Sequence, residues 1–363
     1  MKMRIVIIDT IVNMNVILLC NQGDLSMTQP KGKKLAFAAA SLLAISTVLG
    51  ACGSNNNNNA APSPSASAPA SESASASPSA SAPAAATERT LTDALGHQVT
   101  IPANPQRIIA SYLEDNLVAL GVTPVAQWSV TNGIQEYLQG SLKDVPHISY
   151  DLPFEEVTSF APDLIIVDSA ATVEGDKYDQ YSKIAPTYVV GDQVNNDWRK
   201  ELLAVGEVLG KSAEAQKALD DYEAKAKDAK EKLQASIGTQ SAAAVWLVAK
   251  NFYMVSQDLS AGAVLYGDLG MTAPSLVQEI SGEGEGNWRA VSLEKLATLD
   301  ADHLFLINSD GAASEELKSS VWQNIPAVKN GHVYEFGPET SWLYTGTIAN
   351  GQIIDNVLNS LVK

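Results

Sequence analysis

The stretch KSAEAQKALDDYEAKAKDAKEKLQASIG, residues 211–238, decides the fold of this chain. Its apolar residues recur at steps of three and four, which is the period of one buried face of an α-helix. These residues are Leu219, Tyr222, Ala226, Ala229 and Leu233. Ser212 suits the N-cap, Glu214 suits the positive end of the helix dipole, and Gly238 suits a helix end. A helix of about 25 residues at ~1.5 Å per residue would extend roughly 37 Å, the width of a small domain.

An ordinary amphipathic surface helix has the same pattern, so the sequence on either side must decide between the two interpretations. FEEVTSFAPDLIIV begins at Phe154, and the similar LEKLATLDADHLFL begins at Leu293, 139 residues later. The matched pairs are Glu155 with Glu294, Val157 with Leu296, Phe160 with Leu299, and Asp163 with Asp302. A second match pairs YSKIAP, from Tyr181, with WQNIP, from Trp322. The repeat predicts two similarly built lobes, with the long helix as their connection.

From Thr90 onward, short apolar runs alternate with helical patterns, which is typical of an α/β fold. The expected strands are Val99–Ile101, Arg107–Ser111, Val125–Trp128, Leu164–Val167, Tyr188–Val190, Ala243–Val248, His303–Ile307 and Val333–Phe336. The expected further helices are Asn116–Leu120, Phe154–Phe160, Gly262–Leu269, Ser292–Leu299 and Thr347–Val362. We therefore expect two α/β lobes, each a small, mostly parallel sheet with flanking helices, joined by one long rigid helix. Ligands of such paired lobes usually bind in the crevice at the strand ends.

The chain is acidic, since its 363 residues include 24 Lys and Arg against 41 Asp and Glu. Five of the basic and two of the acidic residues precede Cys52, so 19 basic and 39 acidic residues remain, a formal charge of −20. Nucleic-acid binding is disfavoured, because there is no basic stripe to neutralise phosphates. Cys20 and Cys52 are the only cysteines, so neither a disulfide nor a thiolate metal site holds the globular part.

The N-terminal region has the pattern of an export signal. Three lysines at positions 31, 33 and 34 precede the apolar run Leu35–Val48, whose 14 residues are too few for a membrane span and typical of a secretory signal. The following LGAC resembles the lipobox of bacterial lipoproteins, which implies that Cys52 carries a lipid. A second apolar run lies ahead of this complete signal, so we expect translation to start at Met27.

After the signal, GSNNNNN and a run of Ala, Ser and Pro contain almost no apolar bulk. Such a composition cannot bury a core and predicts a disordered tether that holds the globular part off a membrane surface. The predicted organisation is a signal region at 1–51, a lipidated cysteine with the tether at 52–87, an N-terminal lobe at 88–210, the connecting helix at 211–238 and a C-terminal lobe at 239–363.

The globular part, from about Thr90 to Lys363, resembles the iron-siderophore substrate-binding lipoproteins of bacterial ABC importers. The segments that carry the resemblance are DALGHQVTIPANPQRIIA, FEEVTSFAPDLIIV, YSKIAPTYVV, VSLEKLATLDADHLFLI and WQNIPAVKNGHVY. The family implies a monomeric binding protein without enzymatic activity, held on the outer face of the cytoplasmic membrane by the lipid on Cys52, its only cofactor. It also implies that Glu155 and Glu294, one on each lobe, meet arginines of a permease that an ATPase drives.

The residue types restrict the ligand. His97, His147, His303 and His332 show no metal-ligand spacing, so binding of a bare Zn or Mn ion is disfavoured. Beyond the opening segment the only arginines are Arg199 and Arg289, whereas anionic catecholate and citrate chelates need clustered cations. Ferric hydroxamates are neutral or weakly cationic and suit aromatic walls. The segment PETSWLYTGT also resembles the Trp-Tyr segment of hydroxamate-binding members, so we expect a ferric siderophore of the hydroxamate type.

The candidate ligand-binding residues are aromatic or basic and lie near predicted strand ends or in loops. They are Tyr112, Trp128, Tyr253, Trp288, Arg289, Trp342 and Tyr344. For each aromatic residue, core packing is an equal alternative. Arg289 either contacts a chelate oxygen or pairs with a glutamate of the neighbouring EGEG run. Trp246 is expected in the core, Trp198 is expected to pack the helical segment ELLAVGEVLG that follows it, and His303 is expected in the core or at a strand edge.

Several alternatives remain open from the sequence. Cobalamin or haem is the alternative cargo for the same fold, although the absence of an obvious His or Met axial pair argues against haem. A sensory or adhesive surface lipoprotein without transport is a further alternative. A surface-anchored hydrolase would need a nucleophile elbow, and the sequence contains no GxSxG.

Overall fold

The computed structural model of the chain describes residues 87–131, 133–195, 197–282 and 286–362. These residues belong to one compact unit. The predicted signal, the start at Met27, Cys52, the tether and both glutamates of the EGEG run lie outside the described residues, and so do the predictions made for them. None of the helices in the described ranges has the length and apolar composition needed to cross a membrane.

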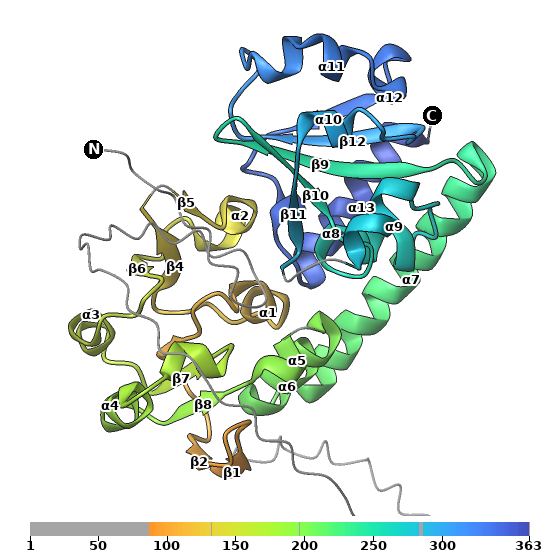
Figure 1. Cartoon of the computed structure of the whole chain (residues 1–363). Coiled ribbons are helices and arrows are strands. Elements are labelled where there is room, and N and C mark those ends of the chain that lie inside the picture. The colour runs from red at the N-terminus through yellow and green to blue at the C-terminus, as the bar shows by residue number, and fades with distance from the viewer. Residues whose placement is uncertain (1–86, 132, 196, 283–285, 363) are drawn as a thin grey trace, which may run out of the picture. The chain divides into compact units, whose positions relative to one another are not determined.

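The predicted long helix is α7, Ser212–Ile237, which packs against α6 (Trp198–Leu209) and α13 (Thr347–Leu361) (Figure 1). Four of the five residues of the predicted apolar stripe are buried, and Leu219 is partly buried. Gly238 ends the helix as predicted, at a φ of 63°, a left-handed conformation that favours glycine.

The predicted N-cap of α7 was wrong. Ser212 is the first helical residue, and Lys211 precedes it without a side-chain cap. The reason is the tight junction with α6, which ends at Gly210 with a φ of 71°. Only Gly210 and Lys211 lie between the two helices, and the backbone N–H of Lys211 donates to Gly206 O at 2.7 Å.

Each lobe contains the same parallel three-stranded arrangement. In the N-terminal lobe the neighbouring strands are β3 (Ile108–Ile109), β7 (Leu164–Val167) and β8 (Thr187–Val189). In the C-terminal lobe they are β9 (Ala242–Val248), β12 (His303–Asn308) and β13 (Val333–Phe336). In both lobes the strands are parallel and their order follows the chain. This shared arrangement confirms two similarly built α/β lobes.

The lobes differ at the edges of these sheets. β10 (Asn251–Val255) and β11 (Trp288–Val291) extend the C-terminal sheet as antiparallel strands next to β9. In the N-terminal lobe, β4 (Gln127–Val130) lies between β5 (Gly133–Ile134) and β6 (His147–Ser149) in a sheet of its own. The strand expected from Val125 therefore begins two residues late, because Val125 N–H donates to Ile108 O at 2.9 Å beside β3.

The repeat has a physical counterpart in two matched aspartates. Asp163 accepts the backbone N–H groups of Gln106 and Arg107 at 2.7 and 2.9 Å, just before β3 begins. Asp302, its partner in the repeat, accepts the backbone N–H of Ser241 at 2.8 Å, just before β9 begins. Each carboxylate thus fixes the start of the strand that neighbours its own, which explains why the same residue type stands at this position in both halves.

The remaining helical segments are mostly short. In the N-terminal lobe they are α1 (Glu114–Ala119), η1 (Glu136–Leu138), α2 (Gln139–Leu142), α3 (Phe154–Ser159), η2 (Ala170–Val173), α4 (Lys177–Ile184) and α5 (Asp192–Asn195). In the C-terminal lobe they are α8 (Ser260–Gly262), η3 (Ala263–Asp268), α9 (Ser275–Ser281), α10 (Leu293–Leu296), η4 (Glu316–Lys318), α11 (Ser320–Gln323), α12 (Pro326–Lys329) and η5 (Ser341–Leu343).

Two helix predictions needed correction. The expected helix Gly262–Leu269 starts earlier as α8 and continues as the wider turns of η3, where Leu269 N–H donates to Val264 O, five residues back. The expected helix Ser292–Leu299 is the single turn α10, which Ser292 caps by accepting the N–H of Lys295 at 3.2 Å. Beyond that turn, the N–H groups of Thr298 and Leu299 bond only three residues back, which closes the helix early.

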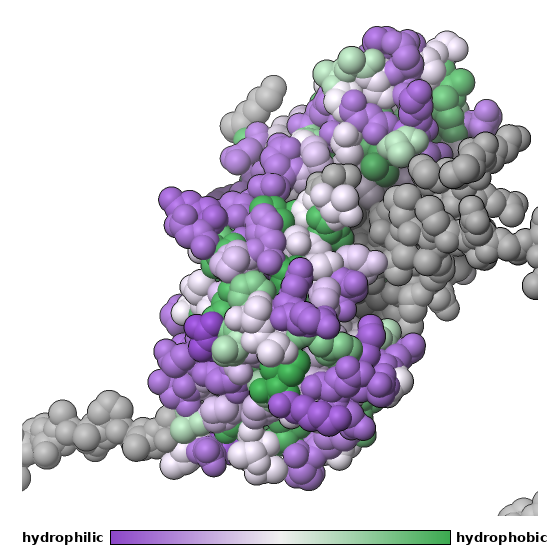
Figure 2. Space-filling model, turned by 90° about the vertical axis from the view of Figure 1, so that its left-hand side faces the viewer, coloured by the Kyte–Doolittle hydropathy of each residue, from purple (hydrophilic) through white to green (hydrophobic). Residues whose placement is uncertain are grey.

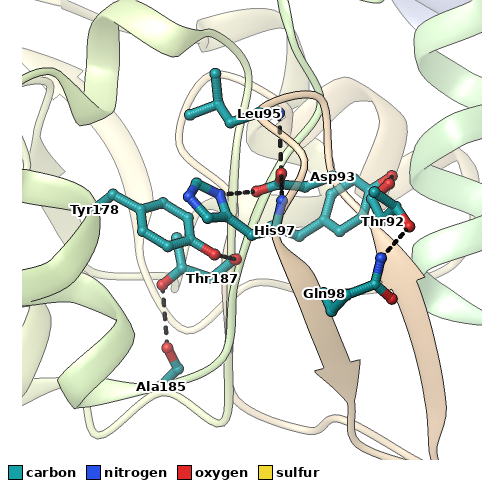
Figure 3. Close-up of polar contacts among 9 residues, drawn as sticks. Thr92, Asp93, Leu95, His97, Gln98, Tyr178, Ala185 and Thr187 are labelled. Carbon is teal, nitrogen blue, oxygen red and sulfur yellow. Dashed lines mark hydrogen bonds and ion pairs between the residues drawn. The ribbon is translucent and has the colours of Figure 1, made fainter.

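The described chain begins with a hairpin, β1 (Arg89–Thr92) and β2 (Gln98–Ile101), which is fastened to the N-terminal lobe (Figure 3). Asp93 accepts the backbone N–H groups of Leu95 and His97 and lies 3.0 Å from His97 Nδ1. The His97 ring stacks on Tyr178 of α4 with centroids 3.7 Å apart, and the Tyr178 hydroxyl donates to Thr187 O of β8. The turn of the hairpin is therefore fixed by a local carboxylate, and it is held on the lobe by this ring pair and by the hydrogen bond from Ala94 N–H to Val189 O at 3.0 Å.

One hydrophobic core runs through both lobes along α7. It contains Leu117 and Leu202 of the N-terminal lobe, Ala229 of α7, and Phe305 and Ile353 of the C-terminal lobe. Each lobe also has a smaller core of its own on the other face of its sheet. The connecting helix is thus packed against both lobes along its length, which supports the rigid connection.

We expect Ala229→Leu to lower the free energy of unfolding by about 1–3 kcal/mol, because the added side chain has no room in this close-packed core. Ala224→Leu is the matched control, since Ala224 is exposed on the same helix, and its effect should stay within about 0.5 kcal/mol. Chemical denaturation of both variants measures the difference. Equal effects would show that α7 is not packed in the core at Ala229.

Candidate functional site

Four aromatic side chains from the two lobes meet near the start of α1. Tyr112 lies edge-on to Trp128 with ring centroids 4.9 Å apart, and 6.4 Å from Tyr344 of the C-terminal lobe. Tyr137 lies 5.0 Å from Tyr344. The three tyrosines are partly buried, and Trp128 is 7% exposed. We call these four residues the inter-lobe aromatic cluster; three of them are among the seven candidate ligand-binding residues.

Tyr112 follows β3 at a φ of 67°, which is uncommon for a residue with a side chain. A conformation of this kind costs on the order of 1–3 kcal/mol and persists where the surrounding structure imposes it, which happens most often at functional sites. Tyr344 belongs to the C-terminal lobe, and its hydroxyl donates to Ile134 O of the N-terminal lobe at 3.2 Å. The ring arrangement therefore depends on contacts between the lobes.

Asp115 joins the lobes by capping α13. Its carboxylate accepts the backbone N–H groups of Ile348 at 3.0 Å and Ala349 at 2.9 Å, and the Tyr137 hydroxyl at 3.0 Å. Asp115 is 3% exposed, and its burial raises its pKa to about 6, although these hydrogen bonds act to lower it. Gly346, at a φ of 137°, approaches so closely that a Cβ there would lie 2.4 Å from Asp115. Only glycine fits at this junction.

Three more carboxyl groups lie in the same part of the N-terminal lobe, where Glu114 and Glu201 are buried and Asp168 is partly buried. Glu114 is fully buried; its Oε1 accepts the Trp128 N–H at 2.6 Å, and burial raises its pKa to about 8. Glu201 of α6 accepts Asn116 Nδ2–H at 2.8 Å, and burial raises its pKa to about 8 as well. Burial also raises the pKa of Asp168, the residue after β7. We call Glu114, Asp115, Asp168 and Glu201 the buried acidic cluster.

The candidates in the C-terminal lobe lie partly in the core. Tyr253 and Trp288 both approach Trp246, with centroids 5.3 and 6.1 Å away, and Trp246 donates from Nε1 to Ser309 Oγ. Trp342 is fully buried between Phe305 and Phe336, so in this structure it packs as a core residue and does not line a surface. Its position does not support the predicted ligand contact.

Arg289 and Arg199 have different surroundings. Arg289 is partly buried on β11, opposite Met254 of β10. Arg199 pairs with Glu223 of α7 at 2.6 Å and with Asp268 at 2.8 Å. Arg199 therefore links α6 to α7 and to η3. The predicted contact between an arginine and a chelate oxygen then depends on Arg289 in the C-terminal lobe.

The three residues predicted as structural are buried. Trp198 is 6% exposed and lies edge-on to Tyr222 of α7, and Trp246 belongs to the core shared by the lobes. His303 is 5% exposed, and burial lowers its pKa. No group of His, Cys, Asp or Glu side chains within the described ranges is arranged to hold a metal ion.

Glu155 and Glu294 occupy matching positions. Each is exposed in the first turn of a short helix, α3 or α10. Each helix is held to its lobe by the matched residues Val157 and Leu296, both fully buried. On the side of the molecule shown in Figure 2, hydrophilic residues predominate and hydrophobic residues form small separate patches.

A surface groove of about 260 Å³ lies elsewhere in the N-terminal lobe. It is lined by Gln106 before β3, Val122 after α1, Leu209 and Lys211, among others. None of the candidate ligand-binding residues lines this groove. We therefore base the site on the inter-lobe aromatic cluster.

The sequence patterns did not identify Tyr137 or the buried acidic cluster as parts of the site. A signal for part of it was present, because the run LEDNL places two carboxylates at the start of a short apolar helix directly after a strand. Acidic residues at such a position are typical of a helix N-terminus, so the pattern alone does not indicate that they are buried. Glu201 follows Glu114 by 87 residues, so only the folded structure shows that it belongs to the same cluster.

Comparison with known proteins agrees with this architecture. A family model described as periplasmic binding protein matches residues 111–340. The iron(3+)-hydroxamate-binding protein FhuD of Bacillus subtilis is 29% identical over 272 residues, covering 73% of this chain and 84% of that protein. A FhuD-fold binding protein of Bacillus subtilis has a TM-score of 0.63 at 26% identity, over 75% of this chain and 100% of that one. Staphylococcus aureus SirA, solved with staphyloferrin B, has a TM-score of 0.62 at 27% identity, over 75% and 98%.

Asp115→Ala is expected to lower the free energy of unfolding by about 1–3 kcal/mol, because three buried or partly buried donors lose their acceptor. Since the folded pKa is raised to about 6, the carboxyl stabilises the protein fully at acid pH and less as pH rises through 6, so the loss should be larger near pH 5 than near pH 8. Asp144→Ala is the control at an exposed position. Denaturation at both pH values measures this, and equal losses for the two variants would exclude the cap.

Proposed function

We propose that this chain, which belongs to the periplasmic binding protein family, captures a ferric siderophore and delivers it to the permease of an ABC importer. The observation that carries the proposal is the inter-lobe aromatic cluster, in which Tyr112 and Tyr344 come from different lobes and lie 6.4 Å apart. Rings from both lobes offer a chelate flat apolar contacts that exist only in the assembled protein. The role is binding and transfer, with no chemical reaction.

Charge favours a hydroxamate chelate within this proposal. The carboxyl groups of Glu114, Asp115 and Asp168 lie beside the aromatic cluster, as their effects on the phenol groups of Tyr112 and Tyr137 indicate. Where these carboxyl groups are ionised, they would repel anionic catecholate or citrate complexes. The relative FhuD is named for iron(3+)-hydroxamate binding, which agrees with this choice.

The location follows from the N-terminal region. We propose that the chain is exported, that Cys52 carries a lipid, and that residues 52–87 tether a monomeric binding protein to the outer face of the membrane. The LGAC sequence and the Ala, Ser and Pro composition support this. Glu155 and Glu294 would then meet basic pockets of the permease, since two exposed carboxylates at a fixed separation can orient the protein there.

Titration of tryptophan fluorescence tests the ligand class. Ferric hydroxamates should quench and saturate at concentrations at least about tenfold lower than ferric catecholates, ferric citrate, haem or cobalamin. Trp128→Phe should lose most of the signal, because Trp128 contacts Tyr112, whereas Trp322→Phe, in the separate core of the C-terminal lobe, should keep it. Saturable quenching by haem or cobalamin alone would show that the ligand is not a siderophore. Quenching by catecholates alone would overturn the charge argument.

Transport tests the docking role. The double variant Glu155→Ala, Glu294→Ala should bind the ferric chelate with the same affinity as the unmodified protein, yet reduce iron uptake by cells at least about tenfold. Glu231→Ala, an exposed glutamate on α7, is the control and should transport normally. Loss of chelate binding in the double variant, or normal uptake, would contradict the docking role.

A further inference from the structure

We propose that this protein selects ferric chelates that carry a positive charge, and that the buried acidic cluster beneath the inter-lobe aromatic cluster is the selecting element. The inference rests on the proposed function, since it assumes that the chelate binds against Tyr112 and Tyr344. It goes further by assigning the sign of the ligand's net charge and the residues that interact with that charge.

The four carboxyl groups converge from three parts of the N-terminal lobe. Glu114 and Asp115 open α1, Asp168 follows β7, and Glu201 lies on α6. The charge of Asp168 acts on both glutamates, and the charge of Asp115 acts on Glu201. Within the described residues, Glu114, Asp115 and Glu201 form no ion pair. A group of acids this deeply buried is costly unless positive charge or protons accompany it.

The cluster also contains more acceptors than donors. Asn116 is 1% exposed and uses its Nδ2–H for Glu201, while its Oδ1 has no hydrogen-bond partner. Oε2 of Glu114 and Oε1 of Glu201 are buried without a partner as well. Buried acceptors without donors are rare in folded proteins, so these three oxygens indicate that a donor or a positive charge belongs near them. In the unliganded protein, protons on the two glutamates meet this need.

The field of the cluster reaches the aromatic surface. Burial and then the charges of Tyr344, Asp168, Glu114 and Glu201 raise the pKa of Tyr112. The groups that face the cluster from the neighbouring elements are Tyr112 before α1, Tyr137 of η1 and Tyr344 after η5, and Glu136 adds its charge at Tyr344. Each of these four named groups is a phenol or a carboxyl group. A cation over the tyrosine rings would gain from their faces and from carboxylates that low-dielectric surroundings screen little.

Binding of a cation must then be linked to loss of protons. Glu114 and Glu201, with pKa values raised to about 8, hold protons over much of the neutral range, and Asp115 does so below about pH 6. A nearby positive charge favours the ionised carboxylates and lowers these pKa values. The affinity for a cationic chelate should therefore rise between about pH 6 and pH 9, and protons should be released on binding near pH 7. A neutral chelate has no such linkage.

A series of three ligands isolates the charge. The probes are the ferric complex of a linear trihydroxamate with a free terminal amine, and the same complex with that amine acetylated or succinylated, so that the terminal group is positive, neutral or negative. Calorimetric titration of the full-length protein in buffers of different ionisation enthalpy gives the affinity and the protons released. Near pH 8.5 the cationic complex should bind about tenfold tighter than the acetylated one, equivalent to about 1.4 kcal/mol. Near pH 6 the ratio of these two affinities should fall to about twofold or less.

Two variants tie the effect to the cluster. Glu114→Gln retains an oxygen for the backbone N–H of Trp128. Near pH 8.5 it should reduce the preference for the cationic over the neutral complex, measured as the ratio of their affinities, to about twofold. Glu201→Gln, which retains an acceptor for Asn116, should reduce it in the same direction and serves if Glu114→Gln fails to fold. Glu231→Gln on the exposed face of α7 is the control and should leave the ratio unchanged.

The outcomes separate this inference from the proposed function. Binding of all three complexes with equal affinity at both pH values, without proton release, would overturn charge selection and leave siderophore binding intact. Binding of none of them would overturn the proposed function itself. Tightest binding of the succinylated complex would reverse the sign of the selection and contradict the inference directly.

Discussion

The packing of α7 against both lobes at once is the constraint on which the rest of the structure depends. A helix joined to only one lobe would leave the other free to turn, but here a single core continues from Leu202 of α6 through Ala229 to Ile353 of α13. Asp115 adds a polar fixing point, because its buried carboxylate caps α13 from the opposite lobe. The apolar core and this cap together determine where Tyr112 and Tyr344 lie relative to each other.

In this frame the proposed binding site and the proposed docking surface would belong to the same rigid body. A continuous helix lacks the loop residues that absorb large rotations, so ligand capture should move the lobes only modestly. The exposed carboxylates of Glu155 and Glu294 would then keep nearly the same separation when a ligand binds. The buried acidic cluster also fits a rigid frame, since carboxyl groups held away from water keep raised pKa values and a field that a bound chelate would meet.

Much of the fold could be predicted from the sequence, because its signals are local or repeated. The stripe of α7, the apolar strands and the matched pair Asp163 and Asp302 follow from periodicity and spacing. The boundary details could not, since the N-terminus of α7 depends on the tight junction with α6, and the turns of η3 depend on bonds five residues back. For the site, Tyr112, Trp128 and Tyr344 were named, whereas the burial of Trp342 and the acidic cluster arises from contacts between distant segments.

The central claim is that a ferric chelate binds at the inter-lobe aromatic cluster. Locating the iron atom by anomalous X-ray scattering, in crystals of the protein grown with a ferric trihydroxamate, tests this most directly. The account predicts one iron site whose chelate touches the rings of Tyr112 and Tyr344 together. An iron site in contact with only one lobe and with neither of these rings would contradict it.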